Sequence, residues 1–233
     1  MNRLLVEQAA HRAGIELSVG MTEQVCEFIE LLKETNDKIN LTAITDDEAI
    51  ATLHLEDSWR VSAHIPENAT LIDIGTGAGF PGLALRIVRP DLDVTLVDAT
   101  LKKVTFLQKV IDLLELDATT ALHARAEDLG RDQDFRDCYD VAVARAVTAL
   151  PVLSELCLPL VKRGGRLIAM KGSDDQTAQS KRAIRMLGGE LEEVIRYELP
   201  GMDWPRSLVI ISKKEMTASR YPRRMVTIRN SPL

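Results

Sequence analysis

Residues 71–82 read Leu71-Ile72-Asp73-Ile74-Gly75-Thr76-Gly77-Ala78-Gly79-Phe80-Pro81-Gly82, an apolar run followed by four glycines within eight residues. The apolar run predicts a buried strand. The glycines predict a sharp turn whose backbone lies directly against a ligand, because glycine has no side chain to keep the ligand away. Residues 83–88 are helix-compatible, so the loop is expected to present backbone N–H groups at a helix N-terminus. This pattern is typical of a site for a nucleotide cofactor.

Downstream of this loop, short β-rich runs alternate with amphipathic stretches, which predicts a parallel sheet covered by helices. The last two runs follow a helix-like segment at 176–187 and are separated only by residues 200–205. We therefore expect them to form an antiparallel pair at the edge of the sheet. The expected strands are 71–74, 94–97, 119–122, 141–144, 166–170, 193–199 and 207–212.

Upstream of the loop, residues 1–69 are predicted to be helical. Val25, Phe28, Ile29 and Leu32 recur at helical spacing, and Thr45-Asp46-Asp47-Glu48 matches a capping box. The chain is thus predicted to be an α/β protein in three parts. These are an N-terminal helical cap (1–69), a sheet domain (70–213) and a basic C-terminal tail (214–233).

The bulk composition suits one globular domain with a small appendage. The 233 residues are 45% hydrophobic, and no segment approaches the roughly 18 apolar residues that a membrane span needs. The three cysteines are scattered and lack metal-ligand spacing. A cytoplasmic protein without a membrane or metal partner is expected.

The charge is unevenly distributed. A formal net charge of −6 argues against a nucleic-acid partner, but residues 213–233 alone carry +5. Such a tail fits either an RNA contact or a solvated, frayed terminus, and composition alone does not choose between them.

The glycine loop satisfies two cofactor patterns. Residues 77–82 fit the G-x-G-x-x-G pattern of dinucleotide sites, and Asp73 with Gly75, Gly77 and Gly79 fits a methyl-donor pattern. Both patterns expect an acid that binds ribose hydroxyls at the end of the second strand, and Asp98 stands there, 19 residues past Gly79.

The flanking residues favour S-adenosylmethionine. A carboxylate at Asp73 would repel a pyrophosphate, but it suits the cationic amino-acid end of S-adenosylmethionine. After the third strand, Ala126-Glu127 begins a polar patch suited to adenine, although a solvated loop is an equal interpretation. No Gly-Lys-Ser/Thr follows the glycines, which excludes a phosphate-binding P-loop.

Arg145, at the end of the fourth predicted strand, stands where the acceptor of the methyl group is expected to bind. Neither an Asn/Asp-Pro-Pro-aromatic clamp nor a suitably placed cysteine nucleophile accompanies it, and no histidine has a partner at motif spacing. An acceptor that is already nucleophilic, such as guanine N7, needs only alignment with the methyl group. Arg145 could position the guanine or a phosphate, and a surface ion pair is the alternative.

These residues resemble the bacterial small-subunit ribosomal RNA guanine-N7 methyltransferases, the RsmG or GidB family. The resemblance runs almost end to end, although Met225-Val226 and Ile228 depart from the family's Gly- and Pro-containing ending. The motifs that carry it are Asn40–Ile44, His54–Ser58, Asp73–Gly82, Val97-Asp98 with Lys102-Lys103, Arg125–Glu127, Arg145–Val147, Lys171-Gly172 and Tyr221–Arg224.

The resemblance implies a class I (Rossmann-like) fold and methyl transfer from S-adenosylmethionine to N7 of a guanine in the decoding-region loop of 16S rRNA, free or in the 30S particle. It also implies that Gly75 and Phe80 contact the cofactor, that Ala126 and Glu127 hold the adenine, and that Arg145 lies between cofactor and substrate. The candidate RNA-binding residues are Lys102, Arg166, Lys171, Arg223 and Arg224.

Three other functions compete with this one. A small-molecule methyltransferase of the same fold would suit the acidic net charge, and a dinucleotide-dependent oxidoreductase would suit the glycine pattern. A non-catalytic RNA-binding or assembly protein would keep the loop as a vestige.

Overall fold

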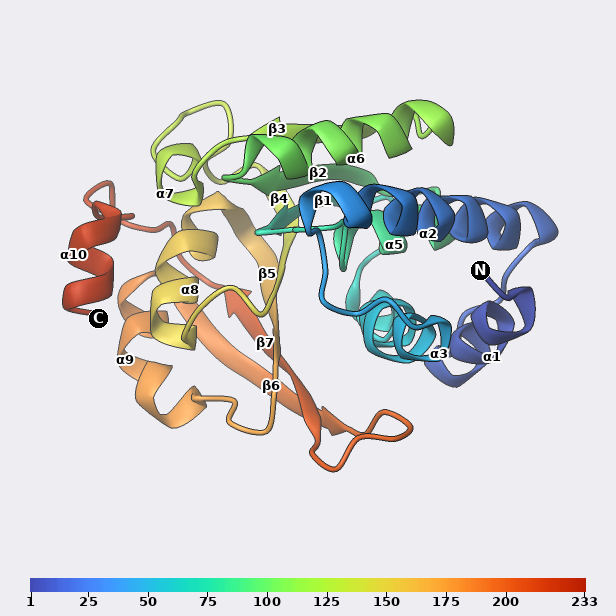
Figure 1. The fold of residues 1–233 in the computed structure, drawn as a ribbon. Coiled ribbons are helices and arrows are strands. Elements are labelled where there is room, and N and C mark those ends of the chain that lie inside the picture. Colours follow the sequence, from blue (N-terminus) through green and yellow to red (C-terminus); the bar gives the residue numbers. More distant parts are fainter. The chain divides into compact units, whose positions relative to one another are not determined.

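The computed structural model describes residues 1–233, and seven strands form one mixed sheet with flanking helices (Figure 1). The strands are β1 (Thr70–Ile74), β2 (Asp93–Asp98), β3 (Thr119–His123), β4 (Tyr139–Arg145), β5 (Val161–Lys171), β6 (Gly189–Tyr197) and β7 (Arg206–Lys213). Their order in the sheet is β3-β2-β1-β4-β5-β7-β6. The predicted α/β fold is confirmed, and so is the antiparallel pairing of β6 with β7 at the sheet's edge.

The chain divides into two compact units. Unit 1 comprises residues 1–68 and 76–123, and unit 2 comprises residues 69–75 and 124–233. The break after residue 68 lies one residue before the predicted end of the helical cap, but unit 1 also takes in β2 and β3. The predicted three-part division stays a prediction.

Unit 1 begins with two helices, α1 (Arg3–Ala13) and α2 (Val19–Ile39). Ser18 caps α2 by accepting the N–H of Met21, and the predicted apolar face of α2 is buried. Trp59 is also fully buried, and its indole N–H donates to the carbonyl of Ala84 at 2.9 Å. The N-terminal helices are therefore packed on the glycine loop's own helix within this unit.

The segment between α2 and the sheet contains a π-helix. A short α3 (Asp47–Ala49) runs into η1 (Ile50–Glu56), a π-helix, and then into α4 (Asp57–Trp59) and η2 (Ser62–His64). The predicted capping box was wrong in its N-cap residue. The cap is Asp46, not Thr45, because the Asp46 carboxylate accepts the N–H of Ala49 at 3.0 Å.

The remaining elements of unit 1 surround the loop. They are α5 (Gly82–Val88), which is buried over its whole length, α6 (Leu101–Leu113), and the parallel pair β2 and β3. Val97 and Asp98 end β2 opposite Leu122 and His123 of β3. Because parallel strands expose their carboxyl ends at the same edge, this end of β2 is where a ligand of a doubly wound sheet is expected.

Unit 2 carries the rest of the sheet. Its helices are α7 (Ala126–Leu129), α8 (Leu150–Cys157), η3 (Leu158–Leu160), α9 (Thr177–Met186) and α10 (Met225–Asn230). β1 pairs in parallel with β4 and β4 with β5, whereas β7 runs antiparallel to both β5 and β6. Helices α8 and α9 pack on these strands (Figure 1).

The C-terminal tail is docked onto unit 2. Glu155 is fully buried, and Arg223 donates to both of its carboxylate oxygens. Arg136 donates to the carbonyls of Thr217 and Tyr221 at 2.6 and 2.8 Å. The interpretation of the tail as a frayed terminus is wrong, because buried ion pairs and hydrogen bonds hold it. No helix in the protein has both the length and the apolarity to cross a membrane.

Candidate functional site

In unit 1 the glycine loop, residues 76–82, lies against the C-terminal end of β2, where the N–H of Thr76 donates to the carbonyl of Val97 at 3.1 Å. Gly77 and Gly79 have φ values of +62° and +99°, which residues with a side chain rarely adopt. A Cβ on Gly79 would meet Leu83 at 3.0 Å and Leu107 at 3.1 Å. The need for glycine thus has a physical basis in backbone conformation at both positions, and at Gly79 also in packing.

Asp98 joins this loop to the start of α6. It is 7% exposed, and it accepts the N–H of Gly77 at 3.1 Å and the N–H of Thr100 at 2.8 Å. Lys103 lies 3.5 Å from the same carboxylate. The predicted ribose-binding acid is therefore fixed against the loop by the protein's own donors, at the carboxyl end of a central strand.

Phe80 anchors the loop to the N-terminal helices. Its ring is 3% exposed and stacks on His54, with centroids 4.4 Å apart and an interplanar angle of 12°. The centroid of the Phe28 ring lies 5.2 Å from that of Phe80. His54 Nε2 is 2.9 Å from Thr42 Oγ1. Sequence reasoning treated His54 as a structural or surface residue and missed its position behind the loop; the only signal was its place in the motif His54–Ser58.

In unit 2, Gly75 and the segment after β4 are in close contact. Gly75 has φ +73°, and a Cβ there would lie 2.7 Å from Val147. Arg145 ends β4 opposite Met170 of β5, and the next residue of β5, Lys171, donates to the carbonyl of Thr148 at 2.8 Å. The structure thus groups three predicted site residues, Gly75, Arg145 and Lys171, around one stretch of backbone.

Asp73 is fully buried in β1. Burial raises the pKa of the Cys157 thiol far above its usual value, and the negative charge of Asp73 raises it further. Cys157 is therefore a buried thiol that is unsuited to act as a nucleophile.

The predicted adenine patch forms the first turn of a short helix. Ala126 is buried at the start of α7, and Glu127 is half-buried one residue later. These two residues belong to unit 2, whereas Gly77, Phe80 and Asp98 belong to unit 1.

The candidate RNA-binding residues have different surroundings. Lys102 is exposed and donates to the carbonyl of Ile39 at 2.8 Å, and Arg224 is exposed at the start of α10. Burial lowers the pKa of Lys171. Arg223 is bound to Glu155, and Arg166 lies near the middle of β5, opposite Val141 rather than Arg145.

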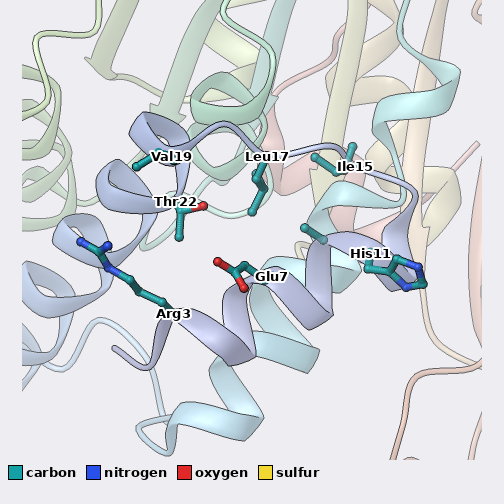
Figure 2. Close-up of a pocket in the computed structure, with 8 residues that line it drawn as sticks. Arg3, Glu7, His11, Ile15, Leu17, Val19 and Thr22 are labelled. Atoms are coloured by element: carbon teal, nitrogen blue, oxygen red, sulfur yellow. The ribbon is translucent and has the colours of Figure 1, made fainter.

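A separate surface pocket lies between α1 and the start of α2 (Figure 2). It has a volume of about 320 Å³, and Ile15, Leu17 and Thr22 line it beside the Glu7 carboxylate. None of the residues predicted to bind the cofactor or RNA lines this pocket, so we do not assign the cofactor to it.

Comparison with known proteins gives a consistent assignment. The GidB family, described as rRNA small subunit methyltransferase G, matches residues 21–200. A protein of Acetivibrio thermocellus named ribosomal RNA small subunit methyltransferase G is 44% identical over 235 residues, covering 100% of this chain and 97% of that protein. A namesake from Oceanobacillus iheyensis is 43% identical over 225 residues, covering 94% of each chain.

Solved structures share the fold at low sequence identity. An S-adenosylmethionine-dependent methyltransferase from Aquifex aeolicus has a TM-score of 0.54 and 16% identity, covering 71% of this chain and 94% of its own. M. jannaschii TYW2, solved in complex with S-adenosylmethionine, has a TM-score of 0.53 and 14% identity, covering 69% of this chain and 76% of its own. The sheet is therefore of the class I methyltransferase type.

Proposed function

The chain belongs to the GidB family of rRNA small subunit methyltransferases G, and we propose that it methylates N7 of a guanine in the decoding-region loop of small-subunit rRNA. It is an S-adenosylmethionine-dependent methyltransferase. The glycine loop, whose Gly77 N–H is bound to the Asp98 carboxylate, supports the methyl donor, whereas the choice of acceptor is supported by the family and by Arg145 at the end of β4.

The residues present fit S-adenosylmethionine. Glycines at positive φ give the loop a sharp turn that residues with a side chain rarely adopt, and Asp98 stands where ribose hydroxyls would need an acceptor. Asp73, Gly75, Gly77, Gly79, Phe80, Ala126, Glu127 and Arg145 would complete the binding site. When bound, the cofactor supplies a methyl group activated by its sulfonium sulfur.

Guanine N7 suits the side chains that this chain offers. N7 carries a lone pair and no proton, so its methylation requires no general base. Cys157 is held as a thiol, and His54 is occupied between Thr42 and Phe80. The task left to the protein is alignment, for which Arg145 offers a planar guanidinium.

The partner that this function requires is small-subunit rRNA or the 30S particle, and the reaction belongs in the cytoplasm, where the ribosome is assembled. Of the predicted RNA contacts, we retain Lys102, Arg166, Lys171 and Arg224. Arg223 is engaged by a buried carboxylate in the structure, so we assign it to holding the tail rather than to the RNA.

The decisive experiment incubates the protein with labelled S-adenosylmethionine and small-subunit rRNA, or 30S particles, and maps the modified nucleotide. Label on N7 of one guanine in the decoding-region loop is expected. Label on another nucleotide, on protein or nowhere would contradict the proposal. A thermal shift with S-adenosylhomocysteine but not with NAD(H) is expected in parallel, since only the true cofactor stabilises the fold strongly.

Arg145→Ala tests the alignment role. The side chain is half-exposed at the end of β4, so the fold is expected to survive its loss. Turnover on rRNA is expected to fall at least 10-fold while the protein remains folded by circular dichroism. Unaltered turnover would remove Arg145 from the site.

A further inference from the structure

A groove of about 600 Å³ lies between the C-terminal end of α2 and the first two turns of α6, both in unit 1. Lys38 comes from α2, and Lys102 and Lys109 come from α6. Leu101, 61% exposed, adds an apolar surface to the groove. No acidic side chain lines it.

This concentration of lysines is unusual for its surroundings. Unit 1 carries 19 acidic and only 10 basic side chains, and three of those ten line this one groove. The other lysine of unit 1 outside α6, Lys33, is paired with Asp47, whereas the three groove lysines form no ion pair. Their positive charge is thus available to a ligand.

The helix itself adds positive potential. The first turn of α6 holds Lys102 and Lys103 and no acid, although the N-terminus of a helix favours negative charge. Asp98, the predicted ribose-binding acid, accepts the N–H of Thr100 at 2.8 Å, and the next residue, Leu101, lines the groove, so one end of the groove lies next to the C-terminal end of β2 within this unit. An anion seated at that end would therefore lie near the acid that we propose for the cofactor ribose.

We propose that this groove binds the backbone of the substrate RNA next to the target guanosine. Lys38 and Lys109 contact phosphates, and Leu101 packs against a ribose or base. Lys102 combines a phosphate contact with its hydrogen bond to the last turn of α2. This inference rests on the proposed function. It adds the location of a substrate-binding surface and two lysines, Lys38 and Lys109, that the sequence did not single out.

The test is the salt dependence of binding to a small-subunit rRNA fragment. The double variant Lys38→Gln/Lys109→Gln is expected to bind about 10-fold more weakly near 0.1 M salt, and to lower the slope of log K against log salt by about 1 to 1.5, since two single-strand phosphate contacts are lost. Its affinity for S-adenosylhomocysteine should not change. Leu101→Ser is expected to weaken binding about 3-fold without changing the slope, because it removes no charge.

The matched control is Arg3→Gln/Lys33→Gln, which removes the same charge from the same unit but outside the groove. It should keep the RNA affinity and slope of the parent protein. A groove variant indistinguishable from the parent would overturn the groove assignment alone. A loss seen with 30S particles but not with naked rRNA would overturn it in favour of a protein contact. A parent protein that neither binds nor methylates rRNA would overturn the proposed function itself.

Discussion

Asp98 ties the glycine loop to β2 and α6 through three polar contacts. Its oxygens accept the N–H groups of Gly77 and Thr100 and attract Lys103. Such a carboxylate does two things at once: it holds the loop against β2, and it keeps an acceptor at the position that ribose hydroxyls are expected to require.

We therefore expect Asp98→Asn to weaken S-adenosylhomocysteine binding about 10- to 100-fold, because an amide replaces one acceptor oxygen by a donor. Isothermal titration calorimetry measures the change. The control is Asp93→Asn, at the exposed start of the same strand, which should bind like the parent. Equal affinities of the two variants would show that Asp98 does not contact the cofactor.

His54 supports the loop from behind through the Phe80 ring. His54→Ala removes a buried ring and is expected to destabilise the protein by about 2–4 kcal/mol, as other large-to-small core substitutions do. His54→Phe keeps the stack on Phe80 but loses the contact with Thr42, so much of the stability should return. Urea denaturation separates the two.

The affinity of the two His54 variants for S-adenosylhomocysteine provides a second comparison. If the stack positions the loop, His54→Phe should retain cofactor affinity while His54→Ala loses it by about 10-fold at a temperature where both are folded. Parent-like affinity in the alanine variant would limit His54 to a role in stability.

At the scale of elements, the sequence predicted the first four strands closely, since β1, β2, β3 and β4 begin and end within two residues of their predicted bounds. Three of them, β1, β2 and β4, are mostly buried and therefore apolar, as parallel strands are expected to be, whereas β3 is a half-exposed edge strand. β6 begins four residues earlier than predicted. It is an edge strand that begins with exposed Glu residues, and its position in the sheet comes from pairing with β7 and not from its own apolar pattern.

The π-helix η1 was beyond local reasoning. Its seven residues keep the apolar spacing of an α-helix, so periodicity predicts the helix but not its extra-wide turns. What distinguishes the segment is long-range. Glu56 is fully buried and binds Arg12 and Arg60, one of them 44 positions away in the chain. A sequence pattern contains no record of such a partner.

The tail shows how two adjacent arginines acquire different roles. Arg223→Ala leaves the buried Glu155 carboxylate without its partner, and we expect a loss of about 2–4 kcal/mol in stability, discounted because the Arg223 side chain is still 23% exposed. Arg224→Ala, on an exposed side chain, should stay within about 0.5 kcal/mol of the parent. Urea denaturation of both variants tests this.

RNA binding should show the opposite order. Arg224→Ala is expected to reduce the salt slope of RNA binding by about 0.7 and Arg223→Ala to leave it unchanged. A stability loss in Arg224→Ala equal to that in Arg223→Ala would contradict the division of roles.

At the scale of the whole molecule, the α/β sheet and its antiparallel edge pair were predictable because they depend on short, regularly spaced residues, whereas the cofactor role of the loop and of Asp98 stays a prediction. The uneven distribution of charge was also visible in the sequence, but the sequence did not show which basic residues are free to bind RNA. In the basic tail, Arg223 is engaged in an ion pair within the protein. Lys38 and Lys109 lie 71 positions apart in the chain, and they line the same groove only because α2 packs on α6. Neither outcome can be derived without tertiary structure.

The stability of the fold at low pH depends on carboxylates in several parts of the molecule. Arg89 donates through Nε and Nη2 to the two carboxylate oxygens of Asp91, and this hydrogen bonding lowers the pKa of Asp91 to about 2, below its usual range. A hydrogen bond from the Lys33 side chain lowers the pKa of Asp47, and a hydrogen bond from the backbone N–H of Thr177 lowers the pKa of Asp175. Below pH 4 the unfolded chain therefore binds more protons than the folded one, so the free energy of unfolding falls as the pH falls towards 2.

Asp91→Asn isolates one of these groups. The folded pKa is depressed, so the stabilisation by Asp91 is fully present above about pH 5 and is lost as the pH falls through 4 to 2. We expect the variant to be about 1–2 kcal/mol less stable than the parent at pH 6, after discounting for partial exposure, and to approach the parent near pH 2. Urea denaturation at pH 6, 4 and 3 measures the difference. A gap between the two proteins that stays constant from pH 6 to pH 3 would mean that Arg89 stabilises the turn through packing rather than through the charge of Asp91.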